Sequence, residues 1–128
     1  MSKLDRESVI GISALLVHAA KIDEIYSEQE KELIKNCIKS YLNDENVDDA
    51  LKKAEEIEND SNQLITFTSI LKKNSMEIKK DILKHLWKII ISDNTVDQYE
   101  SNLMRRICGL IYFPDKECAE IKLKLINL

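Results

Sequence analysis

Apolar residues recur along this chain at intervals of three and four positions, which is the spacing of one face of an α-helix. The widest apolar surface lies between Met76 and Ser92, where two adjacent rows of large aliphatic side chains accompany Trp87. Because so wide a surface must be buried on most sides, we expect this helix to form the centre of the core. The whole pattern predicts six or seven helices, over about residues 5–20, 27–42, 47–58, 62–72, 76–92, 97–113 and, as a short last helix, 114–128.

The chain also carries an internal repeat. Asp23 and Glu30 are seven residues apart, and so are Asp93 and Glu100. The step from Asp23 to Asp93 equals the step from Glu30 to Glu100, at 70 residues, and the apolar positions that follow each pair align as well. We therefore predict a compact bundle with a duplicated helix–turn–helix, in which each copy contains one acidic turn.

The composition supports an all-α fold in one domain spanning residues 1–128. Two glycines and one proline are too few for the many turns of a sandwich or barrel, and 128 residues suffice for one hydrophobic core. The net charge of −4 argues against nucleic acid as a main partner. No stretch has the roughly 20 apolar residues that membrane insertion needs. Three cysteines without paired spacing indicate a cytoplasmic, reducing location.

The two acidic turns admit two interpretations. In the first, the residue three positions before each glutamate caps a helix and the glutamate bonds back to it, which stabilises the helix by roughly 0.5–2 kcal/mol. In the second, the carboxylates bind a divalent cation, calcium or magnesium. The sequence lacks the EF-hand pattern with its central glycine, so such a site would bind weakly. The candidate metal ligands are Asp23, Glu30, Asp93, Asp97 and Glu100.

The segments Ala19–Glu30 and Leu86–Glu100 resemble the TerB-like family, whose mark is an acidic turn, Ala-Asp-Gly followed later by Glu, occurring twice in an all-helical domain. The run Glu100–Tyr112, with its paired arginines, is similar to the second copy in the tellurite-resistance branch. The family's glycine is replaced here by Glu24 and Asn94, and asparagine is the better of the two in a left-handed turn.

This resemblance covers nearly the whole chain and implies a bacterial, cytosolic protein associated with tellurite or stress resistance. It further implies acidic residues that bind metal, and no established catalysis. Related domains precede J-domains in co-chaperones, where they resemble interaction modules. The resemblance therefore implies binding functions and no reaction.

The cysteines and histidines have ordinary structural explanations. Cys37, Cys108 and Cys118 fall on apolar stripes and are predicted to pack in the core. The alternative is that an oxidant such as tellurite reacts with an exposed thiolate, for which Cys108 is the candidate. His18 and His85 lack a partner at ligand spacing, so we expect them to be partly buried and hydrogen-bonded. No nucleophile–base pair or glycine-rich phosphate loop occurs, and we predict that the chain is not an enzyme.

Charged residues are distributed unevenly along the chain. Acidic residues concentrate between Asp44 and Asp60, and lysines repeat every four residues on the helix that contains Trp87. Such runs are usually solvated faces, and the alternative is that they bind charged surfaces of other proteins. The candidate partner-binding residues are Asp48, Asp49, Glu55, Glu56, Lys80, Lys84 and Lys88.

Two functions remain open at this stage. One is a TerB-like resistance protein that binds a divalent cation at its acidic turns. The other is a metal-independent interaction module, like a co-chaperone domain or an adaptor, that uses its acidic and basic faces. Convergence of the two acidic turns in space would favour the first. The sequence leaves the oligomeric state open.

Overall fold

The computed structural model describes residues 4–22, 26–43, 46–61, 63–92 and 98–126, with the side chains of residues 98–100 left out. Over these ranges the chain is helical without strands, which confirms the predicted all-α bundle. The helices are α1 (Arg6–Ala20), α2 (Glu28–Leu42), α3 (Val47–Asp60), α4 (Leu64–Lys72), α5 (Met76–Ile91), α6 (Gln98–Ile111) and α7 (Asp115–Ile126).

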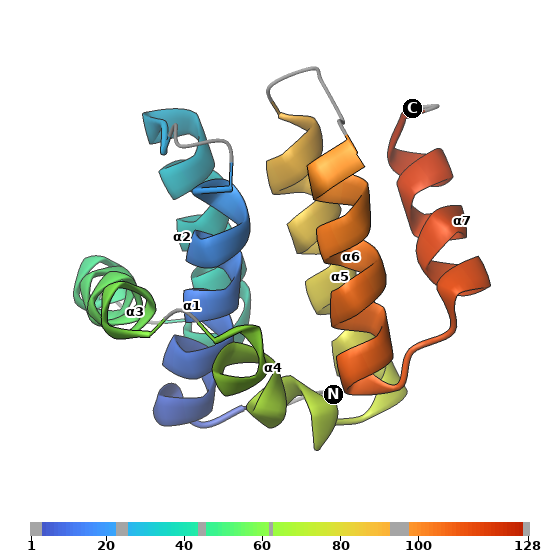
Figure 1. Ribbon diagram of the computed structural model, residues 1–128. Helices are drawn as coiled ribbons and strands as arrows, with labels where there is room; N and C mark the ends of the chain where they lie inside the picture. The colour runs from blue at the N-terminus through green and yellow to red at the C-terminus, as the bar shows by residue number, and fades with distance from the viewer. Residues whose placement is uncertain (1–3, 23–25, 44–45, 62, 93–97, 127–128) are drawn as a thin grey trace.

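The helices form two groups that pack on each other through α1, α2 and α5, and α4 connects them along the chain (Figure 1). In the first group, α1 and α2 run in opposite directions and α3 crosses them, in contact with both. In the second group, α5, α6 and α7 run up, down and up, and α7 packs on α5. Helix α4 lies across one end of the bundle and contacts both α1 and α6. The ends of α1 and α5 and the starts of α2 and α6 therefore share the opposite end of the molecule.

The helix boundaries follow from local capping chemistry. Asp5 accepts a hydrogen bond from the backbone N–H of Ser8 at 2.7 Å, and Ser75 accepts one from Ile78 at 3.3 Å. Helix α6 ends at Ile111 and is followed by Tyr112, whose φ of 59° is left-handed. Helix α7 begins after Pro114, close to where the sequence predicts the break. Each predicted boundary among the first five helices lies within two residues of the observed one.

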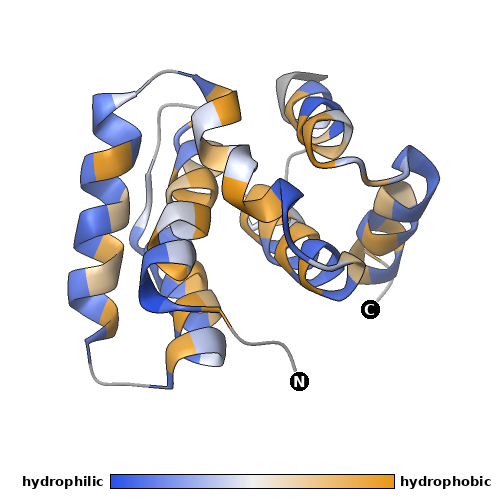
Figure 2. Cartoon of the chain, turned by 90° about the horizontal axis from the view of Figure 1, so that it is seen from below, coloured by the Kyte–Doolittle hydropathy of each residue, from blue (hydrophilic) through white to orange (hydrophobic). Residues whose placement is uncertain are grey.

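The core lies between α1 and α5, and the apolar sides of the helices face inward (Figure 2). Trp87 is 4% exposed and Leu86 is completely buried, so the predicted burial of α5 is confirmed. Helix α1 is equally central, because it contacts α2, α3, α4 and α5. Its small residues, such as Ala14 and Ala19, allow this close packing.

The cysteines and histidines lie where the sequence predicts. Cys37, Cys108 and Cys118 are buried. The alternative for Cys108 is wrong, because this thiol has no exposed surface; its hydrogen bond to Cys118 and its burial both raise its pKa. His18 Nδ1 lies 3.2 Å from a carboxylate oxygen of Glu58 and His85 Nε2 lies 3.5 Å from one of Asp81, and both rings are partly buried.

Candidate functional site

Glu30 is the one predicted metal ligand whose side chain the structure describes. Its Oε1 accepts hydrogen bonds from the backbone N–H of Ser27 at 2.8 Å and from Ser27 Oγ at 3.1 Å. The backbone N–H of Glu30 in turn donates to Ser27 Oγ at 3.1 Å, which completes a capping box at the start of α2. Glu30 is 5% exposed. The capping interpretation is therefore confirmed for this residue.

The remaining metal candidates stay predictions. Asp23, Asp93 and Asp97 lie outside the described residues, and Glu100 belongs to α6 but its side chain is not described. Among the described residues, no group of three or more His, Cys, Asp and Glu side chains is placed to hold a metal ion. The helix ends that flank both acidic turns nevertheless share one end of the bundle (Figure 1).

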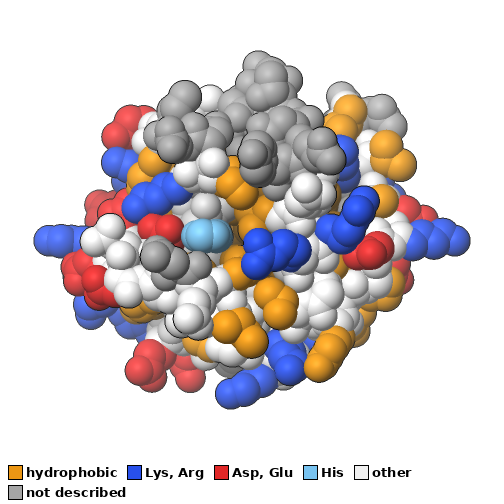
Figure 3. Space-filling model, viewed as in Figure 1, with side chains coloured by type: hydrophobic (Ala, Val, Ile, Leu, Met, Phe, Trp, Pro, Cys, Tyr) orange, Lys and Arg blue, Asp and Glu red, His pale blue; other side chains and the backbone are white. Residues whose placement is uncertain are grey.

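The acidic residues at the start of α3 form ion pairs within the protein. Asp49 lies 3.1 Å from the Arg6 guanidinium of α1, and Asp48 lies 3.1 Å from the Lys35 ammonium of α2. The hydrogen bond from Arg6 is the main cause that lowers the pKa of Asp49. Acidic and basic side chains are interleaved over α3, at the left of the space-filling view (Figure 3). These two predicted partner-binding residues therefore help to hold α3 across α1 and α2.

Further along α3, the predicted residues Glu55 and Glu56 differ in their surroundings. Glu55 accepts a hydrogen bond of 2.6 Å from the Tyr26 hydroxyl. Burial, followed by this hydrogen bond, raises the pKa of Tyr26. Glu56 is exposed and lines a shallow hollow near Tyr26 and Lys31. Only part of the acidic face of α3 therefore offers carboxylates to a partner.

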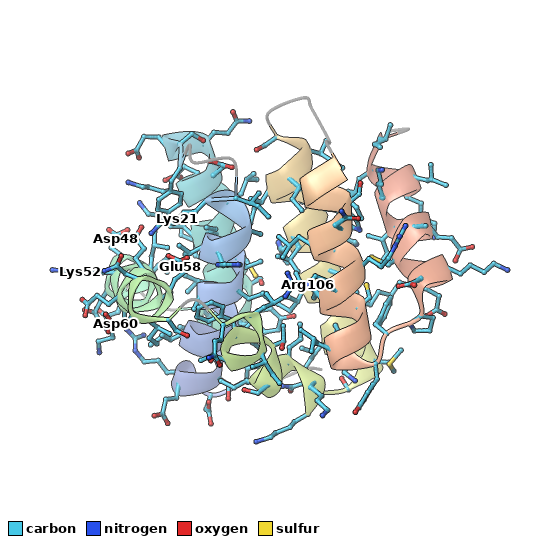
Figure 4. All side chains as sticks on the ribbon, viewed as in Figure 1. Lys21, Asp48, Lys52, Glu58, Asp60 and Arg106 are labelled. Atoms are coloured by element: carbon cyan, nitrogen blue, oxygen red, sulfur yellow. The ribbon has the colours of Figure 1, made fainter. Side chains whose placement is uncertain are left out.

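A cluster that the sequence pattern did not reveal joins α1 to the last turn of α3. One carboxylate oxygen of Glu58 lies 2.8 Å from Lys21 Nζ, and the other lies 3.2 Å from His18 Nδ1. Figure 4 shows Lys21 and Glu58 side by side where the two helices meet. The Glu58 side chain is 11% exposed, so this cluster mainly fastens α3 to α1.

The lysines of α5 form a different kind of surface. Lys80, Lys84 and Lys88 are exposed and lie along one side of a groove of about 410 Å³ between α5 and α7. Helix α7 contributes two apolar side chains, one further lysine and two glutamates. Among the described residues, the lining consists of Lys80, Lys84, Lys88, Glu117, Glu120, Ile121, Lys124 and Leu125. Four lysines against two glutamates leave the groove with an excess of positive charge.

The contribution of α7 to this groove was not predicted. The sequence does place Ile121 and Leu125 on one apolar stripe, and the structure buries Ile121 at 5% exposure against the bundle. Which lysines border that stripe depends on how α7 packs against α5, and no local pattern contains that information. The arrangement can bind an extended or helical segment that is apolar on one side and acidic on its edges.

The fold and this surface define a class of protein: a small all-α bundle with an exposed, lysine-lined groove and a capping box at the start of α2. Comparison with family models matches residues 10–123 to the family described as tellurite resistance protein TerB. The chain belongs to the TerB family. Comparison with curated proteins and with solved structures finds no match. Over the described ranges, no helix has the length and apolar character needed to cross a membrane.

Proposed function

We propose that this TerB-family protein is a non-catalytic binding module, associated with tellurite or stress resistance, that holds an acidic amphipathic helix of another protein in the α5–α7 groove. The observation that carries the proposal is the combination of apolar Ile121 and Leu125 with the exposed lysine row in one groove. The acidic side of α3 offers less, because Asp48 and Asp49 already pair with α1 and α2.

The spacing of the lysines suits a helical partner. Lys80, Lys84 and Lys88 are each one turn apart, which separates them by about 6 Å along the axis of α5. A partner helix with glutamates four residues apart presents its carboxylates at the same interval. Its apolar face would cover the exposed part of Leu125 beside the buried Ile121, and this burial adds affinity that screened surface charges do not. The lysines mainly set orientation and association rate.

The test uses a fluorescein-labelled peptide helix with glutamates four residues apart on one face and leucines on the other. We expect saturable binding by fluorescence anisotropy, weaker in high salt and unchanged in chelator. Lys84→Glu should weaken binding about tenfold or more, because it places like charges together in the groove. Lys52→Glu, at an exposed lysine on α3, is the matched control and should bind like the wild type. Equal losses in the two variants, or no saturable binding, would contradict the proposal.

A second candidate function is the binding of calcium or magnesium at the acidic turns. It is supported by the position of the flanking helix ends, which share one end of the bundle (Figure 1). The test is an amide NMR titration of the chelator-stripped protein, repeated on Asp93→Asn/Glu100→Gln. Saturable shifts near residues 92–101 that vanish in the double variant would support a metal site. Shifts spread over all exposed carboxylates would leave the turns as capping structure.

The proposed location is the cytoplasm. Three free cysteines support it, because thiols persist in a reducing compartment. The test is fractionation of cells that produce the protein with a C-terminal epitope tag. Recovery of the protein outside the cytoplasmic fraction would contradict this assignment.

A further inference from the structure

Two of the buried cysteines share one site with Trp87, although they come from different helices. Cys108 lies on α6, Cys118 lies in the first turn of α7, and Trp87 lies on α5. The indole N–H of Trp87 donates a hydrogen bond of 3.3 Å to Cys118 Sγ. Cys108 interacts with Cys118 closely enough that each thiol shifts the pKa of the other. Cys118 therefore accepts from the indole and lies next to a second thiol.

The chain reversal between α6 and α7 brings the two cysteines together. Tyr112 adopts the left-handed conformation, and the backbone N–H of Phe113 donates to the carbonyl of Cys108 at 2.9 Å. This pattern ends α6 abruptly, and Pro114 then leads directly into α7. Cys118 consequently faces back toward α6 while lying near the positive end of the α7 dipole, where a thiolate is favoured.

The cysteines also border a surface hollow. Cys108, Cys118 and Trp87 line a cavity of about 580 Å³, together with exposed Arg105 and Lys116. Lys122 lines it too, with its ammonium 5.3 Å from the centre of the Trp87 ring, and Asp115 is the one carboxylate among the lining residues that the structure describes. The hollow therefore has a largely cationic rim, and of its two cysteines only Cys118, at 5% exposure, retains any surface.

We propose that Cys118 and Cys108 form a peroxide-reactive thiol pair, in which Cys118 is the nucleophile, Cys108 is the resolving thiol and the substrate is a small hydroperoxide. The geometry of the site carries this assignment: the Trp87 indole N–H donates to Cys118, Cys118 lies in the first turn of α7, and Cys108 borders the same hollow.

The electrostatics of the site agree with these roles. The hydrogen bond from Cys108 is the main cause that lowers the pKa of Cys118; burial opposes it and the bond from Trp87 adds to it. The interaction with Cys118, together with burial, raises the pKa of Cys108. Cys118 is thus the thiol that loses its proton first, and the thiolate is the reactive form.

The reaction balances with the hydroperoxide as the only oxidant. The Cys118 thiolate attacks one peroxide oxygen, the O–O bond breaks, and the leaving oxygen takes up a proton and departs as water or alcohol. Cys118 is then a sulfenic acid. The sulfur of Cys108 attacks Cys118 sulfur, the S–O bond breaks, and hydroxide leaves as water with the proton from Cys108. The two thiols have together given two electrons to the peroxide, and a disulfide joins α6 to α7.

Cys37 supplies an internal comparison. It is 2% exposed, and burial raises the pKa of its thiol. The structure gives it neither an indole donor nor a thiol partner among the residues described. We therefore expect peroxide to leave Cys37 reduced while the pair on α6 and α7 is oxidised.

The test treats the reduced full-length protein with hydrogen peroxide, quenches with an alkylating reagent and maps the peptides by mass spectrometry. We expect a Cys108–Cys118 disulfide, an intact mass lower by two hydrogen atoms, and Cys37 recovered in its alkylated form. Absence of this disulfide, or oxidation of Cys37 at the same rate, would overturn the proposal. This arm needs no variant and so does not depend on the folding of one.

Variants then assign the roles. In Cys108→Ser, dimedone should trap a sulfenic acid at Cys118, whereas Cys118→Ser should give no dimedone adduct and no disulfide. Cys37→Ser is the matched control and should form the disulfide at the wild-type rate. Trp87→Phe keeps an aromatic ring but removes the N–H, and should slow the disulfide formation about tenfold. A dimedone adduct at Cys108 in the Cys118→Ser variant would reverse the assignment.

Discussion

Replacement of Glu30 separates the two roles that its carboxylate can play. Oε1 accepts hydrogen bonds from Ser27 N at 2.8 Å and from Ser27 Oγ at 3.1 Å, and Glu30 is 5% exposed. Glu30→Ala removes this acceptor and leaves the Ser27 donors without it. Loss of a helix cap costs about 0.5–2 kcal/mol, and burial favours the upper part of that range. We therefore expect the free energy of unfolding to fall by about 1–2 kcal/mol.

Glu30→Gln keeps a carbonyl oxygen in place of the carboxylate. Glutamine completes a capping box as glutamate does, so a capping role predicts less than half of the alanine loss. A metal ligand behaves differently, because calcium bound to the folded state would stabilise the wild type and not the glutamine variant. The two substitutions together therefore distinguish a cap from a ligand.

The assay is urea unfolding followed by far-UV circular dichroism, first in chelator and then in excess calcium. Glu28→Ala is the matched control, since Glu28 is an exposed acid in the same helical turn whose ion pair with Lys31 spans 3.5 Å. Glu28→Ala should lower the free energy of unfolding by only a few tenths of a kcal/mol. In chelator, a glutamine variant as unstable as the alanine variant would refute the capping argument, and so would an alanine loss no larger than that of Glu28→Ala.

Substitutions at three further positions test the fold. Trp87→Ala should cost about 3–5 kcal/mol in chemical denaturation, because the side chain is 4% exposed; an almost unchanged midpoint would contradict its burial. The hydrogen bond from His85, with a second from Tyr41, lowers the pKa of Asp81 from 3.8 to about 2. The ionised Asp81 therefore stabilises the fold fully at pH values above 3.8, its pKa in the unfolded chain, and this stabilisation is lost as the pH falls through about 2. The difference in unfolding free energy between the wild type and Asp81→Asn should shrink as the pH falls from 3.8 to about 2. Asn43, at a φ of 54°, ends α2, and Asn43→Ala should cost about 1 kcal/mol in thermal unfolding whereas Asn43→Gly should not.

The helices could be predicted because their signals are local. The apolar rows around Trp87 define α5 to within one residue of its observed end at Ile91, and Pro114 fixes the break before α7. The capping box of Ser27 and Glu30 is likewise a pattern of four consecutive positions. Such features need no knowledge of distant residues.

The surfaces could not be predicted, because they depend on how distant helices pack. The contact of Asp49 with Arg6 spans 43 residues of sequence, and nothing near either residue indicates it. The sequence predicts that Lys80, Lys84 and Lys88 lie in one row on α5, but it does not predict that the apolar residues beside them come from α7. The proximity of Cys108 and Cys118 had a local signal. Cys108 shortly precedes the predicted helix break at Pro114, Cys118 shortly follows it, and both lie on apolar stripes.

The most direct test of the proposed function is an amide NMR titration of the labelled protein with the acidic amphipathic peptide. If the peptide lies in the α5–α7 groove, the largest shifts should fall within 80–88 and 117–125, and Lys84→Glu should require about tenfold more peptide to produce them. Shifts concentrated on α3, or scattered over every basic residue, would contradict the account.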